Sequence, residues 1–170
     1  MVIDQEQEDT LLELLNTTPV VGGAVQDLLN APGAEAWQRA QGCSGTEEER
    51  GHLLRAREVL QAVVRGDYDA GALSELLDGV VYSPGVDDEG LVWDLQAPPE
   101  RRAAVQAVLT WNALHQNKPG RLRPCANPAC RLFLLDRSKP NKARWCSMAV
   151  CGNRMKARRH YQRVREETAE

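Results

Sequence analysis

Hydrophobic and polar positions predict a series of helices along the first two thirds of the chain. Within residues 4–16 a cluster of leucines (Leu11, Leu12, Leu14 and Leu15) predicts a short helix, which residues 17–19 and 22–23 end with Thr-Thr-Pro and Gly-Gly. Two more short helices are expected over 24–30 and 34–41, on either side of the turn-forming Ala-Pro-Gly at 31–33.

A longer helix is expected to begin at Thr46. Thr46 and Glu49 have the spacing of a capping box, in which each side chain accepts a hydrogen bond from a free backbone N–H. The helix should continue to about residue 65 and end at Gly66, with Leu53, Leu60 and Val64 on one stripe. Arg57 lies on the same stripe, so it needs an anion or a set of acceptors, because a buried charge without a partner is costly.

Residues 69–117 predict two helices separated by a β-hairpin. A helix is expected over 69–78, then short β-prone runs at 80–82 and 91–93 around a turn, then a helix from Pro98-Pro99 to about residue 117. The inner stripe of this last helix is predicted as Arg101, Val105, Val108, Leu109 and Asn112, with Trp111 and His115 at its edge. The predicted fold is therefore mainly α with a small β-hairpin, in the α+β class.

Four cysteines in two pairs, Cys125/Cys130 and Cys146/Cys151, carry the clearest chemical signal. Four residues separate the members of each pair, which favours one structural Zn²⁺ bound by four thiolates. Such a shell is closed and leaves no position for a substrate. Two disulfides, or four unrelated buried thiols, are the alternatives. The acidic first residues lack a secretory signal, which argues for a cytoplasmic protein with reduced thiols. Cys43 is the fifth cysteine and is interpreted as an incidental thiol.

Around these cysteines the sequence predicts a treble-clef-like module. Its expected parts are a knuckle at 125–130, strands at 132–135 and 143–146, and a long basic helix over 148–165. Phe133, Leu135 and Trp145 would form its small core. A boundary at residues 118–120 divides the chain into an acidic helical domain, 1–117, and a basic zinc module, 118–170.

Charge is distributed very unevenly along the chain, although the net charge is only -3. Residues 118–165 contain fourteen of the 21 Lys and Arg residues and one acid, Asp136, whereas residues 1–117 contain twenty of the 24 acids. This asymmetry predicts an anionic partner, double-stranded DNA, for the C-terminal part. The expected contacts are Arg137, Lys139, Lys142, Arg144, Arg154, Lys156, Arg158, Arg159 and Arg163. The alternatives are a solvated basic face and a face docked on the acidic domain. Arg154 is also a candidate for bracing the zinc loop through backbone carbonyls.

Residues 123–163 resemble the CGNR zinc finger, which is named for the run Cys151-Gly152-Asn153-Arg154. The resemblance covers about the last third of the chain. It implies an N-terminal ABATE region, which belongs to stress-induced transcription regulators, and Asn16, Thr17 and the helices after them are compatible with that region. The implied function is that of a bacterial-type regulator that binds DNA in the nucleoid through a zinc module.

Asn16, Arg57, Arg101 and Asn112 are expected to face inward, where they would form a pocket for a small carboxylate or similar anion, with Arg57 as a bidentate clamp. Alternatively, Arg57 pairs with an acid such as Glu13 or Asp94. A ligand in this pocket would shift how the two oppositely charged parts dock.

Other function classes have less support in the sequence. The chain lacks paired catalytic carboxylates, a Ser/His/Asp set, a phosphate-binding glycine loop and an open metal site, so no enzymatic activity is expected. An RNA-binding or protein-interaction module is the main alternative. No apolar run is long enough to span a membrane. A homodimer is compatible with a DNA-binding regulator, although no heptad pattern predicts one.

Overall fold

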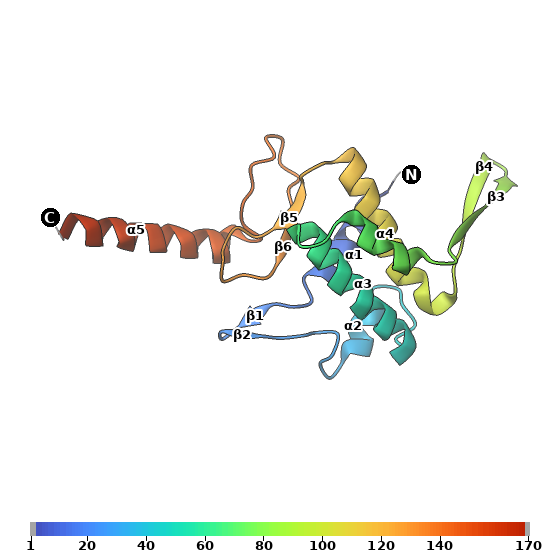
Figure 1. Cartoon of the computed structure of the whole chain (residues 1–170), viewed down its shortest axis with the longest axis horizontal. Helices are drawn as coiled ribbons and strands as arrows, with labels where there is room; N and C mark the ends of the chain where they lie inside the picture. Colours follow the sequence, from blue (N-terminus) through green and yellow to red (C-terminus); the bar gives the residue numbers. More distant parts are fainter. Residues whose placement is uncertain (1–2, 169–170) are drawn as a thin grey trace.

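Three helices form the body of the protein in the computed structural model, which describes residues 3–168 (Figure 1). They are α1 (Gln5–Leu15), α3 (Glu47–Arg65) and α4 (Pro99–Asn117). The short helix α2 (Ala34–Ala40) and a 3₁₀ segment, η1 (Ala70–Leu77), lie against them, with Trp37 and Leu73 packed on the core. Together with antiparallel strand pairs, these helices confirm the predicted α+β class.

Side-chain caps fix where the main helices begin. Thr46 Oγ1 accepts a hydrogen bond from Glu49 N at 3.3 Å, as predicted. The Glu49 carboxylate, however, accepts from Gly45 N at 2.9 Å and from Ser44 Oγ at 2.8 Å rather than completing a reciprocal capping box. At the other end of α3, Gly66 has φ 83°, a left-handed conformation that favours glycine and ends the helix.

The buried face of α4 differs from the predicted stripe. Val105 and Val108 are buried, but Trp111 also lies in the core and Asn112 is exposed. Trp111 carries more apolar area than any other residue of this helix, and burying it rotates Asn112 toward solvent.

Residues 24–30 are not a helix, contrary to the prediction. Strands β1 (Val20–Val21) and β2 (Ala24–Val25) form a small hairpin, and Gly22 and Gly23, with φ 60° and 86°, make its turn. Asp27 then holds a non-helical loop, because its carboxylate accepts from Leu29 N at 3.1 Å and from Asn30 Nδ2 at 2.8 Å.

The predicted second hairpin is present and is longer than expected. Strands β3 (Val81–Asp87) and β4 (Gly90–Gln96) pair in register along their whole length, from Val81 opposite Gln96 to Asp87 opposite Gly90. This hairpin projects away from the helices (Figure 1).

The C-terminal third begins as part of the helical body. Strand β5 (Leu122–Pro124) pairs with β6 (Phe133–Leu135), and Phe133, only 1 % exposed, belongs to the same core as Leu60 and Leu114. Phe133 and Leu135 therefore pack on the body instead of forming a separate core with Trp145.

Residues 143–146 do not form the predicted strand, since β5 already pairs with β6. A π-helical turn, η2 (Met148–Gly152), follows and leads into α5 (Asn153–Thr168), which extends away from the body (Figure 1).

Candidate metal centre and cationic surfaces

The four cysteines of the two pairs meet at one point of the structure. Their sulfur atoms all lie within 4.8 Å of one another, and Cys146 Sγ lies 3.7 Å from both Cys130 Sγ and Cys151 Sγ. A tetrahedron with metal–sulfur bonds of about 2.3 Å has edges of about 3.8 Å, so this spacing fits one tetrahedral Zn²⁺. The thiols are not joined as disulfides. The cluster confirms the predicted ligand group, and its donors suit a structural zinc ion.

Asn127 organises the first cysteine pair. It is 2 % exposed, its Oδ1 accepts from Ala129 N at 3.1 Å, and its carbonyl accepts from Cys130 N at 2.8 Å. Its Nδ2 donates to Cys151 Sγ at 3.3 Å and so links the two pairs. From the sequence Asn127 is recognisable as a turn residue, but the contact with Cys151 is not, because it spans 24 residues.

The surroundings of the sulfurs favour a bound cation if all four cysteines are thiolates. Burial raises the pKa of Cys130 and of Cys146. Burial also acts to raise the pKa of Cys151, but hydrogen bonds from Asn127 and neighbouring thiols outweigh it and lower that pKa. Backbone N–H groups support other sulfurs, with Cys146 N donating to Cys125 Sγ at 3.4 Å and Leu132 N to Cys130 Sγ at 3.5 Å. A divalent cation would offset the repulsion that remains among four thiolates.

Asp136 fixes the loop that follows β6. Its buried carboxylate accepts from Ser138 Oγ at 2.6 Å, from Ala143 N at 2.7 Å and from Arg123 at 2.6 Å. The Ser138 hydroxyl is the main cause that lowers its pKa, with the backbone N–H groups and Arg123 adding to the effect, to about 2. The sequence marks Asp136 only as the one acid of a basic region, and its role as the centre of this network was missed.

The predicted cations of this loop have different environments. Lys139 and Lys142 are exposed, and Arg144 is exposed with its guanidinium 5.3 Å from the Trp145 ring. Arg137 instead pairs with Asp9 at 2.6 Å and with Glu8 at 3.5 Å on α1. Arg137 therefore connects the basic region to the acidic helical body.

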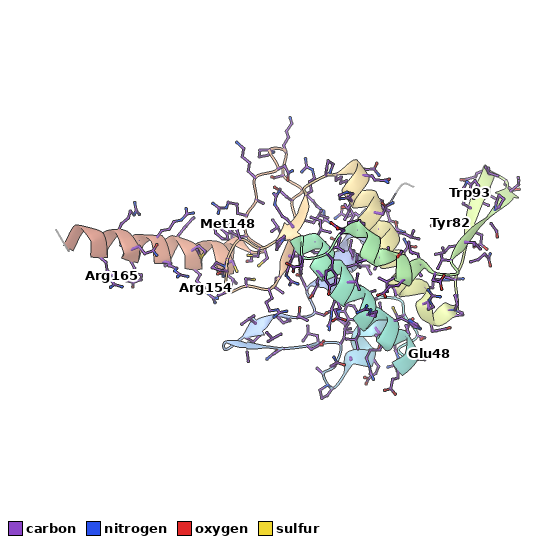
Figure 2. The ribbon with its side chains drawn as sticks, viewed as in Figure 1. Glu48, Tyr82, Trp93, Met148, Arg154 and Arg165 are labelled. Atoms are coloured by element: carbon purple, nitrogen blue, oxygen red, sulfur yellow. The ribbon has the colours of Figure 1, made fainter. Side chains whose placement is uncertain are left out.

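Helix α5 carries the remaining predicted cations, all exposed to solvent: Arg154, Lys156, Arg158, Arg159 and Arg163. Figure 2 shows Arg154 near the beginning of this projecting helix and Arg165 toward its far end. Ala157 and Val164, the small apolar residues of this helix, are also exposed.

The predicted brace from Arg154 to the zinc loop is not observed. Among the described residues, Arg154 makes no hydrogen bond to that loop, whereas Asn153 Nδ2 donates to Ala149 O at 3.2 Å. The local hydrogen bond at this position therefore comes from Asn153.

The four residues of the predicted anion pocket do not converge. Arg57 binds Asp27 through two hydrogen bonds, of 2.6 and 2.8 Å, and Thr17 Oγ1 at 3.0 Å, so its acidic partner is neither Glu13 nor Asp94. Arg101 donates to Leu76 O at 3.2 Å, Asn16 contacts Phe133, and Asn112 is exposed. A separate cavity of about 210 Å³ lies between α1, α2 and α4, with Leu11, Trp37, Cys43 and Ala107 in its wall.

Comparison with protein families finds a match in the C-terminal part of the chain. Residues 121–164 match the family model of the CGNR zinc finger, a segment that contains all four clustered cysteines. No curated protein matches the chain. Among the described residues, no helix is both long and apolar enough to cross a membrane.

Proposed function

We propose that the protein is a DNA-binding transcription regulator whose C-terminal zinc module contacts double-stranded DNA. The observation that carries this proposal is α5, which leaves the metal centre and exposes cations on several sides. No acid occurs between residues 153 and 165. Such a helix gains nothing by self-association in solution, because like charges spaced four residues apart repel.

Phosphate groups would relieve this repulsion. An α-helix fits the major groove of DNA, and neutralising phosphates releases counterions, which drives binding. Lys139, Lys142 and Arg144 would extend the contact from the loop held by Asp136. The arrangement offers many phosphate contacts and no recognisable base-reading code, so it supports affinity more directly than sequence preference.

The zinc ion would have a structural role in this function. Four cysteine ligands close the coordination shell, so the site provides no Lewis-acid position, and we propose no enzymatic activity. The order of knuckle, strand and helix supports a treble-clef-like assignment, and binding to DNA would place the protein at the nucleoid.

We further propose that the helical body is an ABATE-like regulatory domain, as the CGNR resemblance implies. In the structure, α5 is not docked on the acidic residues, which disfavours simple masking of this helix. The Arg137–Asp9 ion pair gives a more direct route by which the helical body could regulate DNA binding. It joins the proposed DNA-contacting loop to α1, and α1 also lines the 210 Å³ cavity.

Fluorescence anisotropy of a labelled DNA duplex with the zinc-loaded full chain tests the proposal. We expect binding that weakens steeply with salt and is lost on chelation. Replacing both Arg158 and Arg159 with Glu should weaken binding and lower the salt slope by about 1.8, that is about 0.9 per phosphate contact.

A matched control is Arg39→Glu, an exposed cation on α2 far from α5, which should leave binding unchanged. An RNA hairpin of equal charge serves as competitor. Absence of duplex binding, or equal loss with Arg39→Glu, would refute the proposal, and stronger competition by RNA would favour an RNA-binding module instead.

A further inference from the structure

The β3–β4 hairpin has two chemically different faces. Because side chains alternate along paired strands, the register places one set of six residues on the same face. These residues are Tyr82, Pro84 and Val86 on β3, opposite Leu95, Trp93 and Leu91 on β4. The other face is mixed, with four polar residues (Ser83, Asp87, Asp94 and Gln96), two glycines and the exposed Val81 and Val92.

The apolar face is open to solvent. Val86 is 81 % exposed, Leu91 65 % and Trp93 60 %. Figure 2 shows Tyr82 and Trp93 on this hairpin, away from the helical body. Alternation of this kind is typical of a sheet that buries one face, and a two-stranded hairpin alone is only marginally stable in water. The sequence pattern therefore predicts that another surface packs on this apolar face.

Charges near the two ends of the hairpin favour a second copy of the chain as the surface that covers it. The tip carries exposed Asp88 and Glu89, and Asp87 Oδ1 orders this turn by accepting from Glu89 N at 2.8 Å. At the base, the first turn of α4 carries Arg102, which is exposed and forms no ion pair among the described side chains, and the half-buried Glu100. A surface with acids at one end and a free cation at the other is complementary to its own copy turned end for end.

We propose that two copies of this chain associate face to face through their β3–β4 hairpins. The two-fold axis passes near Pro84 and Trp93, at the middle of the paired segment. Each hairpin is about 23 Å long, at about 3.3 Å per residue, so the tip of one copy reaches the base of the other. Asp88 of each chain then lies near Arg102 of its partner, whereas a parallel arrangement would bring the two acidic tips together.

The size of the face is compatible with a specific dimer. The exposed area of the six side chains, counted over both copies, is on the order of 1,000 Å², near the lower end for stable interfaces. Trp93, the largest of the six, lies near the centre, where aromatic residues contribute most to association. The dimer would present two α5 helices and thus two zinc modules.

Sedimentation velocity of the zinc-loaded full chain over a range of concentrations tests the association. The wild type is expected to show a reversible dimer. Val86→Lys, on the apolar face, should weaken dimerisation by at least about tenfold, because it places a charge in a buried interface. Val92→Lys is the matched control, since Val92 is 38 % exposed on the opposite face of the same hairpin, and should change the dimer constant by less than about threefold.

A charge exchange tests the arrangement even if Val86→Lys disturbs the hairpin itself. Asp88→Arg should weaken the dimer, and combining it with Arg102→Asp should restore it. A wild type that stays monomeric throughout, equal effects of the two valine substitutions, or a failure of the double variant to recover would each overturn the proposal. If another protein or DNA covers the hairpin instead, the wild type alone stays monomeric, which is the first of these outcomes and overturns the proposal.

Discussion

Asn16 and Phe133 are 117 residues apart in the chain and form two hydrogen bonds with each other. Phe133 N donates to Asn16 Oδ1 at 2.7 Å, and Asn16 Nδ2 donates to Phe133 O at 3.2 Å. The side-chain amide of Asn16, the residue that ends α1, thus bonds the backbone of β6 on the side away from its paired strand β5. It attaches the beginning of the zinc module to the helical body, next to the buried Phe133 ring.

Replacing this amide should destabilise the whole protein. Asn16→Ala leaves the Phe133 N–H and C=O unsatisfied in a partly buried position, and we expect a loss of about 1–3 kcal/mol in the free energy of unfolding. Urea denaturation followed by circular dichroism measures this. Asn117→Ala, at an exposed asparagine, should stay within about 0.5 kcal/mol of the wild type. Equal effects of the two substitutions would contradict the bridging role.

Removal of the metal should selectively unfold α5. This helix is an exposed, like-charged segment attached to the body through Cys151 and Gly152, and isolated helices of its length are marginal in water. We expect chelation, or Cys146→Ser, to remove about a fifth of the helical circular dichroism signal, the share of α5 among the α-helical residues.

Cys43→Ser is the control for the metal experiment, because Cys43 lies in the wall of the cavity outside the cluster. It should retain one zinc per chain and the full signal. Complete unfolding on chelation would show instead that the metal also supports the helical body.

The Asp27–Arg57 pair predicts a dependence of stability on pH. Hydrogen bonds from Arg57 are the main cause that lowers the pKa of Asp27 below its usual 3.8, although burial opposes them. Because the folded-state pKa is the lower one, the stabilisation is fully present above about pH 4 and disappears as the pH falls through the folded-state pKa.

Asp27→Asn should therefore cost about 2–3 kcal/mol at neutral pH, since it leaves the buried Arg57 without a charged partner. Unfolding experiments from pH 7 downward should show the gap between wild type and variant narrowing below about pH 4. Glu58→Gln removes one of the two exposed acidic partners of Arg55 and should cost no more than about 1 kcal/mol. A gap that does not change with pH would mean that the charge of Asp27 is unimportant.

Arg137 and Lys139 are expected to act differently, although they are two residues apart. Arg137 pairs with Asp9, so Arg137→Ala should lower stability by about 0.5–1 kcal/mol. Lys139→Ala should leave stability within about 0.5 kcal/mol and reduce the salt slope of DNA binding by about 0.9. Paired urea and anisotropy titrations measure both. If Lys139→Ala lowers stability and Arg137→Ala lowers the salt slope instead, the contact with the helical body belongs to Lys139.

Local signals in the sequence predicted most of the helices and the metal ligands. Thr46 and Gly66 mark the ends of α3 because a side-chain cap and a left-handed glycine act within a few residues, and the cysteine spacing is itself a local pattern. The hairpin at 81–96 was located but predicted too short, because β3 continues through Pro84 and Gly85, two residue types that are depleted in strands and are typical of turns.

The errors arose where long-range contacts decide the structure. In place of the helix predicted over 24–30, the structure has a loop in which Asp27 combines local bonds to Leu29 and Asn30 with a pair to Arg57, thirty residues away. The strand predicted over 143–146 was excluded because β6 pairs with β5 instead, and no local pattern distinguishes the two partners. The position of Arg137 against α1 was equally invisible, since a charged loop residue carries no sign of which acid it will meet.

Phe133 also limits how the zinc module can be transferred between proteins. Phe133 on β6 packs on the leucines of the helical body. A fragment that begins at residue 118 would lack these leucines and would expose the Phe133 ring to water. A zinc module transferred to another protein would therefore need an apolar surface on which Phe133 can pack. Otherwise Phe133 would have to be replaced with a polar residue, and other contacts would have to fix the orientation of α5.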